Sequence, residues 1–564
     1  MSRSWLLGLG LAVGMVGRPA QAPAQMPASR PRLVLVISID QFRADYLQRF
    51  RRWFVPGGFN LLLRRGASFS EAYYEHGVTL TCPGHSVILT GAYPHRSGIV
   101  ANEWFDLAAH KAEYCAADTT FGLIGVGGEG RSPRNLLVPT VGDELKQATG
   151  GRSRIITLAG KDRSAIMLAG HRADAAYWTE DTLLVTSRYY MRELPAWVQR
   201  FNSSGAITKY QGRTWNRLLP AEAYRIAGSD NVAAEEDPGG MGRTFPHRLG
   251  STRSQTQDFI AGFGTSPFEN EVLVNFAMEA VVQEQLGEDE IPDLLGIGFS
   301  ANDAVGHSYG PDSHELMDIT LRTDRELERL FRFLDQRIGL DRMIVVLTAD
   351  HGVAPLPEVA RGRSPKVNAA RLDPRVITTA AERALRGRYG APRGPVWLAP
   401  SRWVVDLEWP WIYLNLPALE DKRVPVEEAE QVAQAAMMKV RGVAQVFTAA
   451  ELQRRNTASP ASAELTFYPG RSGQLYLALA PYVIPDSDEE GTTHGSPWVY
   501  DTHVPLLWLG GPIPVGPRSE RVAIADVAPT LAALLGIATP AGSEGRVLRE
   551  LFPQTADSTT TAMP

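Results

Sequence analysis

Cysteine is scarce in this chain, which has two cysteines, Cys82 and Cys115, among 564 residues. So few thiols exclude a disulfide-stapled scaffold, and at most one bridge can form. The alternatives are a single bridge, expected in an oxidising compartment, and two buried free thiols. Sequence alone leaves both open because it does not give the separation of the Cα atoms.

An excess of positive charge is also missing. Lysine and arginine number 57 against 62 acidic residues, so the formal net charge is −5. This balance lacks the excess of positive charge that nucleic-acid-binding proteins typically carry, and we expect no nucleic-acid partner. The 44% apolar content excludes wholesale disorder. Gly and Pro are frequent but follow no period, which is typical of a loop-rich enzyme rather than a fibre.

Long hydrophobic runs are absent after the first residues of the chain, so no transmembrane helix is expected there. Residues 1–22 combine the basic Arg3, a short apolar run and the small-residue site Ala20-Gln21-Ala22. This pattern predicts a cleaved signal peptide, although a retained membrane anchor is the alternative. Residues 23–30 would then be a linker and 554–564 a flexible tail. We expect a periplasmic or secreted protein without stable membrane insertion.

Buried parallel strands are predicted at four places where nearly continuous apolar runs occur, at residues 33–39, 154–160, 293–300 and 343–349. Helical patterns lie between several of them, as in βαβ units. The sequence therefore predicts an α/β fold with a central, mostly parallel sheet flanked by helices. Each run leads into polar residues, and open α/β sheets bind ligands at the carboxyl ends of their strands.

Two stretches, about 172–288 and 356–490, fit this core less well. We interpret them as insertions in one catalytic domain spanning 31–553. The second stretch has a small α+β pattern, with strands expected near 411–416, 443–447 and 474–480 and a helix near 426–439. It is expected to form a cap over the site.

Candidate metal ligands gather at the predicted strand ends. Asp303 and His307 are four residues apart, so one helical turn brings both to one side. Asp350 and His351 follow a strand directly; two further candidates are Asp40, at the end of the first strand, and His494, in a loop. Imidazoles with carboxylates suit zinc or a similar transition ion. Any one of them alone would more ordinarily be a helix cap or a structural residue.

A candidate nucleophile, Thr81, precedes an apolar helical pattern. A hydroxyl at a helix start meets backbone N–H donors and the positive end of the helix dipole, which suits an anionic substrate. The local sequence alone favours a plainer interpretation, in which Thr81 is the N-cap and Pro83 lies in the first turn.

The motifs resemble those of the alkaline phosphatase superfamily, in particular the periplasmic, phosphate-irrepressible bacterial enzymes with a threonine nucleophile. The resemblance covers most of the chain after the N-terminal segment. The motifs that carry it are Ile39-Asp40-Gln41-Phe42, Thr81-Cys82-Pro83-Gly84-His85-Ser86, Thr90-Gly91, Asn102-Glu103-Trp104-Phe105-Asp106, Gly160-Lys161-Asp162-Arg163, Asp303-Ala304-Val305-Gly306-His307, Thr348-Ala349-Asp350-His351-Gly352 and Thr493-His494-Gly495.

This resemblance implies two Zn²⁺ ions per chain. One would be held by Asp303, His307 and His494, and the other by Asp40, Asp350 and His351, with Thr81 as a further ligand. The resemblance also implies hydrolysis of phosphate monoesters through a phosphothreonine at Thr81. The phosphoryl oxygens would be bound by Asn102, Lys161 and Arg163. A monoester dianion exposes its oxygens to both cations, whereas a diester carries an organic group in their place.

Three other functions share features with this pattern. A nucleotide pyrophosphatase or phosphodiesterase of the same superfamily would use the same metals, Thr81 and Asn102. A sulfatase is disfavoured because Pro83 directly follows Cys82 and the expected arginine is missing. A binding protein with a degenerate site is disfavoured because no ligand or nucleophile is lost. The remaining histidines near the motifs are interpreted as structural or supporting: His85, His95, His314 and His503.

Overall fold

The structure is a computed structural model that describes residues 30–250, 255–364, 366–392, 401–454 and 463–553. The expected signal peptide, nearly all of the linker and the C-terminal tail lie outside the described residues. Among the described helices, none has the length and apolarity that crossing a bilayer requires.

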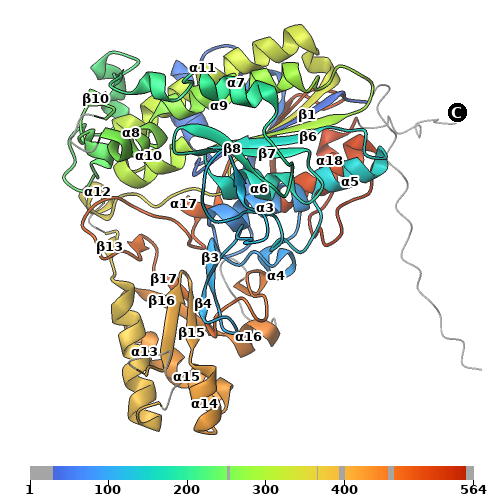
Figure 1. Cartoon of the computed structure of the whole chain (residues 1–564). Helices are drawn as coiled ribbons and strands as arrows, with labels where there is room; N and C mark the ends of the chain where they lie inside the picture. Colours follow the sequence, from blue (N-terminus) through green and yellow to red (C-terminus); the bar gives the residue numbers. More distant parts are fainter. Residues whose placement is uncertain (1–29, 251–254, 365, 393–400, 455–462, 554–564) are drawn as a thin grey trace, which may run out of the picture.

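A ten-stranded sheet forms the centre of the molecule (Figure 1). Its order is β20 (Gly516–Ala523), β2 (Ala67–Tyr73), β19 (Leu506–Leu509), β12 (Met343–Thr348), β1 (Leu33–Ile39), β11 (Asp293–Phe299), β6 (Ile155–Ala159), β7 (Ala175–Glu180), β8 (Leu183–Ser187) and β5 (Leu123–Ile124). The five strands from β12 to β7 are parallel, whereas β8 and β19 run the other way. Every residue of β1 is buried, which explains its unbroken apolar sequence. The expected fold class is confirmed.

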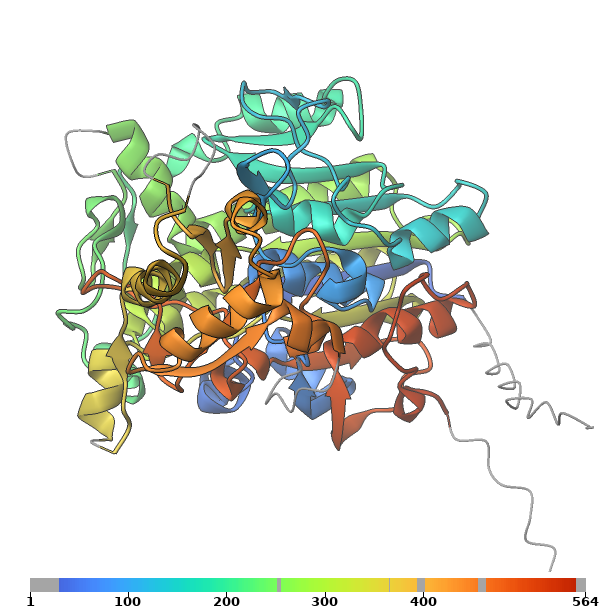
Figure 2. The same cartoon turned by 90° about the horizontal axis from the view of Figure 1, so that it is seen from below.

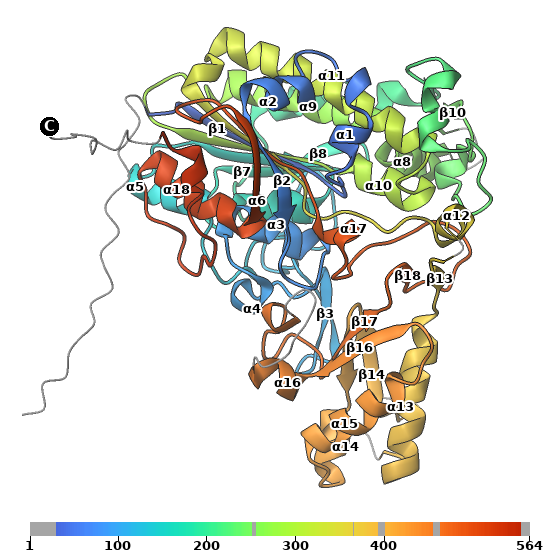
Figure 3. The same cartoon turned by 180° about the vertical axis from the view of Figure 1, so that it is seen from behind.

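Helices cover both faces of the sheet (Figures 1 and 3). On one face lie α9 (Pro267–Gln283) and α11 (His314–Arg337), and on the other α3 (Thr81–Thr90), α6 (Asp162–Ala169) and α18 (Val527–Leu535). The helix α3 is buried along its whole length. A Cβ at Gly84 would lie 2.3 Å from the carbonyl oxygen of Asp350, so only glycine lets α3 approach the end of β12 this closely.

The first expected insertion, 172–288, is smaller than its sequence pattern indicated. Both β7 and β8 lie within this range but belong to the central sheet. The helix α9, at its other end, packs against the sheet, with Val272, Val274 and Phe276 fully buried. The sequence of β7 contains Tyr177 and Trp178, and that of β8 ends in Thr186 and Ser187, so neither is a continuous aliphatic run. The part outside the sheet runs from α7 (Ala196–Ser203) to α8 (Gln255–Gly264).

Residues from the second stretch, 356–490, form a smaller antiparallel sheet below the central one (Figures 1 and 2). Its order is β14 (Val404–Glu408), β15 (Trp411–Leu414), β17 (Leu475–Leu479) and β16 (Val443–Thr448), with α13 (Pro374–Tyr389) and α15 (Val426–Met437) packed beside it. The three expected strands and the expected helix are confirmed. The indole of Trp411 donates to Val100 O at 3.1 Å and the hydroxyl of Tyr476 to Gly77 O at 2.8 Å, which fastens this sheet beside the start of α3.

Candidate active site

Four parallel strands end at one edge of the sheet, and polar residues follow each of them. The register pairs Ile39 with Phe299, Ser38 with Thr348 and Gly298 with Ala159, so the ends of β1, β11, β12 and β6 are level. Asp40, Asp303, Asp350 with His351, and Lys161 follow these ends. The structure thus brings together residues that are up to 311 positions apart in the sequence, as the strand-end pattern predicts.

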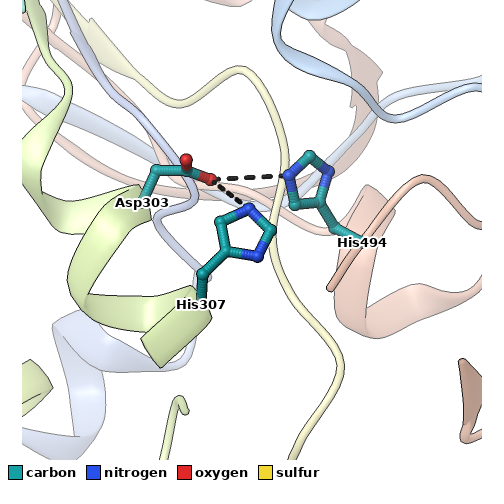
Figure 4. A group of neighbouring side chains, drawn as sticks. All are labelled: Asp303, His307 and His494. Atoms are coloured by element: carbon teal, nitrogen blue, oxygen red, sulfur yellow. Dashed lines mark ion pairs between the residues drawn. The ribbon is translucent and has the colours of Figure 1, made fainter. Parts of the chain in front are cut away.

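The first group of candidate ligands is Asp303, His307 and His494 (Figure 4). Asp303 and His307 lie one turn apart on α10 (Ala301–Tyr309), as their spacing predicts. The Oδ1 atom of Asp303 lies 3.3 Å from His307 Nε2 and 3.4 Å from His494 Nε2. One carboxylate oxygen therefore faces both imidazoles.

The second group is Asp40, Asp350 and His351, all fully buried. The Nε2 atom of His351 lies 3.4 Å from Asp40 Oδ1 and 3.3 Å from Asp350 Oδ2. The two groups are neighbours, since the rings of His351 and His494 stack with their centres 3.6 Å apart.

The hydrogen bonds of the three imidazoles fit metal binding. Each contacts a backbone carbonyl through Nδ1: His307 with Thr492, His351 with Gly352 and His494 with Thr79, at 2.7 to 2.9 Å. A proton on Nδ1 leaves the Nε2 lone pair facing the carboxylates, which is the usual arrangement of metal-binding histidines.

Burial reinforces this arrangement. It lowers the pKa of His351 to about 3 and also lowers that of His494, which favours neutral, ligating imidazoles. Within the described part of the chain, Asp40 Oδ1 and His351 Nε2 are buried without a hydrogen-bond partner. Converging buried atoms of this kind fit a bound cation, and the mixed nitrogen and oxygen donors suit zinc or a similar ion.

Lys161 connects the two groups. Its Nζ atom lies 2.8 Å from Asp40 Oδ2 and 2.5 Å from Asp303 Oδ2. Burial would lower the pKa of Lys161, but the two carboxylates raise it, so the side chain remains a cation. Burial and the neighbouring Asp350 raise the pKa of Asp40 well above its usual range. The lysine therefore offsets part of the repulsion between buried carboxylates.

Arg163 lies in the first turn of α6, two residues after Lys161. Its burial would lower the pKa, but Tyr114 and Asp162 beside it raise it. The hydroxyl of Tyr114 donates to Asp162 Oδ1 at 2.5 Å, and Arg131 Nε donates to Asp162 Oδ2 at 2.7 Å. Sequence reasoning missed Tyr114 as a neighbour of Arg163, because only the folded hairpin of β3 (Glu103–Asp106) and β4 (Lys111–Tyr114) brings it there.

Thr81 is the first residue of α3, and Leu80 occupies the N-cap position without a side-chain cap. The interpretation of Thr81 as the N-cap is therefore wrong. Asn102 lies beside it, since the N–H of Cys82 donates to Asn102 Oδ1 at 2.8 Å. This bond orients the Asn102 amide and leaves its NH₂ group as a donor.

The two cysteines form a disulfide, which decides between the two states left open by the sequence. The N–H of Cys115 also donates to Asn102 O at 2.9 Å. The bridge therefore ties the helix that carries Thr81 to the loop that carries Asn102.

The four remaining histidines near the motifs have local partners. His85 Nδ1 lies 3.0 Å from both Asp350 Oδ2 and Thr81 O, beside the second group. The others contact residues outside the two groups, His95 with Glu544, His314 with Asp230 and His503 with Ser70 O.

The matching family model is that of type I phosphodiesterases and nucleotide pyrophosphatases, which aligns with residues 34–499. The chain belongs to this family, within the alkaline phosphatase superfamily that the motifs resemble. The expected enzyme class, a hydrolase of phosphate esters, agrees with this membership.

Relatives similar over nearly their full length include the alkaline phosphatase PafA of Elizabethkingia meningoseptica, 31% identical over 98% of this chain and 99% of the relative. The alkaline phosphatase PhoV of Synechococcus elongatus is 33% identical over 93% of each chain. A Myroides odoratus relative named a calcium-transporting ATPase is 33% identical over 93% of this chain and 95% of its own. A crystal structure of wild-type PafA superposes with a TM-score of 0.86 at 31% identity, covering 93% of this chain and 100% of that one.

Removing the disulfide with Cys82→Ala and Cys115→Ala is expected to lower the free energy of unfolding. The bridge closes a separation of 33 residues, which corresponds to about 3–4 kcal/mol of restricted unfolded-chain entropy. Urea unfolding of the wild type and the double variant measures this difference. A reductant should lower the free energy of unfolding of the wild type and leave that of the double variant unchanged. Equal free energies of unfolding of the two proteins without reductant would contradict the expectation.

Proposed function

We propose that the chain is an exported, zinc-dependent alkaline phosphatase that hydrolyses phosphate monoesters through a phosphothreonine at Thr81. The observation that carries this proposal is the juxtaposition of two ligand groups at one sheet edge, each with imidazole Nε2 atoms facing carboxylates. Two full-length relatives that bear the name alkaline phosphatase support it.

The two ligand groups would hold one Zn²⁺ each, Asp303 with His307 and His494, and Asp40 with Asp350 and His351. Zinc bound there would supply Lewis-acid stabilisation for the attacking and leaving oxygens of an in-line displacement.

Thr81 is the nucleophile in this proposal. Its Oγ1 attacks phosphorus, the bond from phosphorus to the ester oxygen breaks, and the leaving oxygen takes up a proton in place of the one that the Thr81 hydroxyl loses. Water then hydrolyses the phosphothreonine and releases inorganic phosphate. The position of Thr81 at the start of a ten-residue helix supports this role, because the positive end of the helix dipole favours an anion there.

Three side chains would bind the phosphoryl oxygens. The NH₂ group of Asn102 is available because the amide oxygen accepts the N–H of Cys82, which orients the amide. Lys161 carries three protons, and its bonds to Asp40 and Asp303 leave one of them for a phosphoryl oxygen. The guanidinium of Arg163, beside Tyr114, supplies the second cation.

Phosphodiester hydrolysis is the second candidate, favoured by the description of the matching family model. Both functions would use the same metals and Thr81. The two cations decide between them, because a monoester dianion offers an additional charged oxygen that a diester lacks.

Thr81→Ala is expected to abolish the covalent intermediate and to lower kcat/KM by at least about three orders of magnitude. Mass spectrometry of acid-quenched enzyme after incubation with p-nitrophenyl phosphate would detect a phosphorylated peptide containing residue 81 only in the wild type. Thr81→Ser keeps a hydroxyl and should still be phosphorylated. The variant Thr149→Ala, at a half-buried threonine outside the two ligand groups, serves as a control. A phosphorylated Thr81→Ala protein would mean that another residue is the nucleophile.

Wild-type enzyme is expected to prefer p-nitrophenyl phosphate to bis-p-nitrophenyl phosphate in kcat/KM. Replacing Lys161 and Arg163 together by alanine should depress the monoester reaction by about 10²–10⁴-fold, since each charged hydrogen bond is worth about 1.5–3 kcal/mol. The diester reaction should fall far less.

A matched control for this pair replaces Lys146 and Arg154, which both contact Asp174 away from the site. This variant should change neither reaction. Equal losses for both substrates in the Lys161 and Arg163 variant would contradict the monoester assignment, and a diester preference of the wild type would favour the second candidate.

Export is proposed from residues 1–22, with Arg3, the apolar run and the Ala20-Gln21-Ala22 site. Expression of the full chain in a bacterial host should yield periplasmic protein whose N-terminal sequence begins at Pro23 or within a few residues of it. Recovery of full-length protein in the membrane fraction would instead indicate a retained anchor.

A further inference from the structure

Gln41 follows Asp40 at the end of β1 and has no role in the proposed reaction. It is fully buried, and its backbone adopts the left-handed region with φ of 62°. A buried glutamine in this conformation is uncommon, because only glycine adopts it freely. Its surroundings supply a reason.

The backbone and the side chain of Gln41 contact both ligand groups. Its N–H donates to Asp350 Oδ1 at 3.1 Å, in the second group. Its amide Nε2 donates to Asp303 Oδ1 at 2.8 Å, in the first group. This Oδ1 is the atom that faces the two imidazoles of the first group. Gln41 therefore occupies the junction between the groups.

The carboxylate of Asp303 is held from two sides. Lys161 contacts Oδ2 and Gln41 contacts Oδ1, so rotation of the carboxylate would break at least one of these bonds. The Gln41 amide leaves a second lone pair on Oδ1 for a metal ion. Unlike lysine, the amide carries no charge and does not compete with a cation for this position.

Gly306 on α10 makes room for the Gln41 side chain. A Cβ at position 306 would lie 1.7 Å from Gln41 Oε1, far inside contact distance. Gly306 lies between Asp303 and His307 on the same helix, so the glutamine packs against the turn that carries both ligands. Its amide is thereby confined to the position that contacts Asp303.

We propose that Gln41 is a positioning residue, whose side chain holds Asp303 in the orientation that binds the metal of the first group. This inference rests on the proposed function in so far as the two groups bind zinc. The second group depends on the backbone N–H of Gln41 and not on its side chain.

Gln41→Asn separates these two contributions. Asparagine tolerates the left-handed backbone and keeps the N–H, but its shorter amide withdraws from Asp303. Partners that orient a metal ligand typically contribute 10–100-fold to metal affinity, so zinc binding by the first group should weaken about 10–100-fold. Gly306→Ala should have the same effect, because the added Cβ displaces the Gln41 amide while alanine itself favours the helix.

The test measures zinc dissociation constants by competition with a chromophoric chelator, using metal-free enzyme without the signal peptide. Two backgrounds isolate the groups: His351→Ala leaves the first group intact, and His494→Ala leaves the second. Gln41→Asn is expected to weaken zinc about 10–100-fold in the His351→Ala background and less than about 3-fold in the His494→Ala background. The melting temperature of the metal-free protein verifies folding of each variant.

A matched control is Gln474→Asn. Gln474 is also buried, and its Oε1 accepts the N–H of Leu414 in the smaller sheet. The Gln474→Asn variant should leave zinc binding unchanged in both backgrounds. Unchanged zinc affinity in Gln41→Asn, or equal weakening in both backgrounds, would overturn the role of the side chain. Failure of the wild type to bind two zinc ions would instead overturn the proposed function.

Discussion

Three buried carboxylates, Asp40, Asp303 and Asp350, lie together at one edge of the parallel sheet, and the arrangement of the site depends on how their charges are balanced. Burying neighbouring negative charges costs free energy unless cations lie beside them. Lys161 supplies one cation, with its ammonium between Asp40 and Asp303. The three imidazoles are oriented by backbone carbonyls, so that their Nε2 atoms lie beside the carboxylates in two groups that are able to hold metal ions.

Much of this arrangement could be predicted from the sequence, because the cause is local. The run from Leu33 to Ile39 is apolar on both faces, so it must be a covered strand, and whatever follows it lies at the carboxyl edge. The same argument applies to β6, β11 and β12. The spacing of Asp303 and His307 fixes their common side on a helix, whatever surrounds it. These features need no knowledge of distant contacts.

The rest depends on contacts between distant segments, which local patterns do not encode. His494 lies beside Asp303, 191 positions away in the sequence, and its ring is oriented by the contact of Nδ1 with Thr79 O. The pairing of Cys82 with Cys115, and the approach of Tyr114 to Arg163, follow from the fold of one hairpin. The strands β7 and β8 belong to the central sheet although the sequence predicts an insertion there, because Tyr177 and Trp178 in β7 and Thr186 and Ser187 in β8 break the continuous aliphatic pattern.

The charges of the site also bear on the substrate. The three carboxylates together with Lys161 and Arg163 carry a formal charge of −1, which would repel any phosphate ester. Two divalent ions in the proposed groups would bring it to +3, so a monoester dianion leaves +1 and a diester anion leaves +2. With both ions in place, the net charge of the site would be smallest with the dianion bound, so its affinity for such a substrate would depend on the metals. In the proposed arrangement, the same cations that offset the burial of the carboxylates would also favour the monoester over the diester, which would link the stability of the sheet edge to its chemistry.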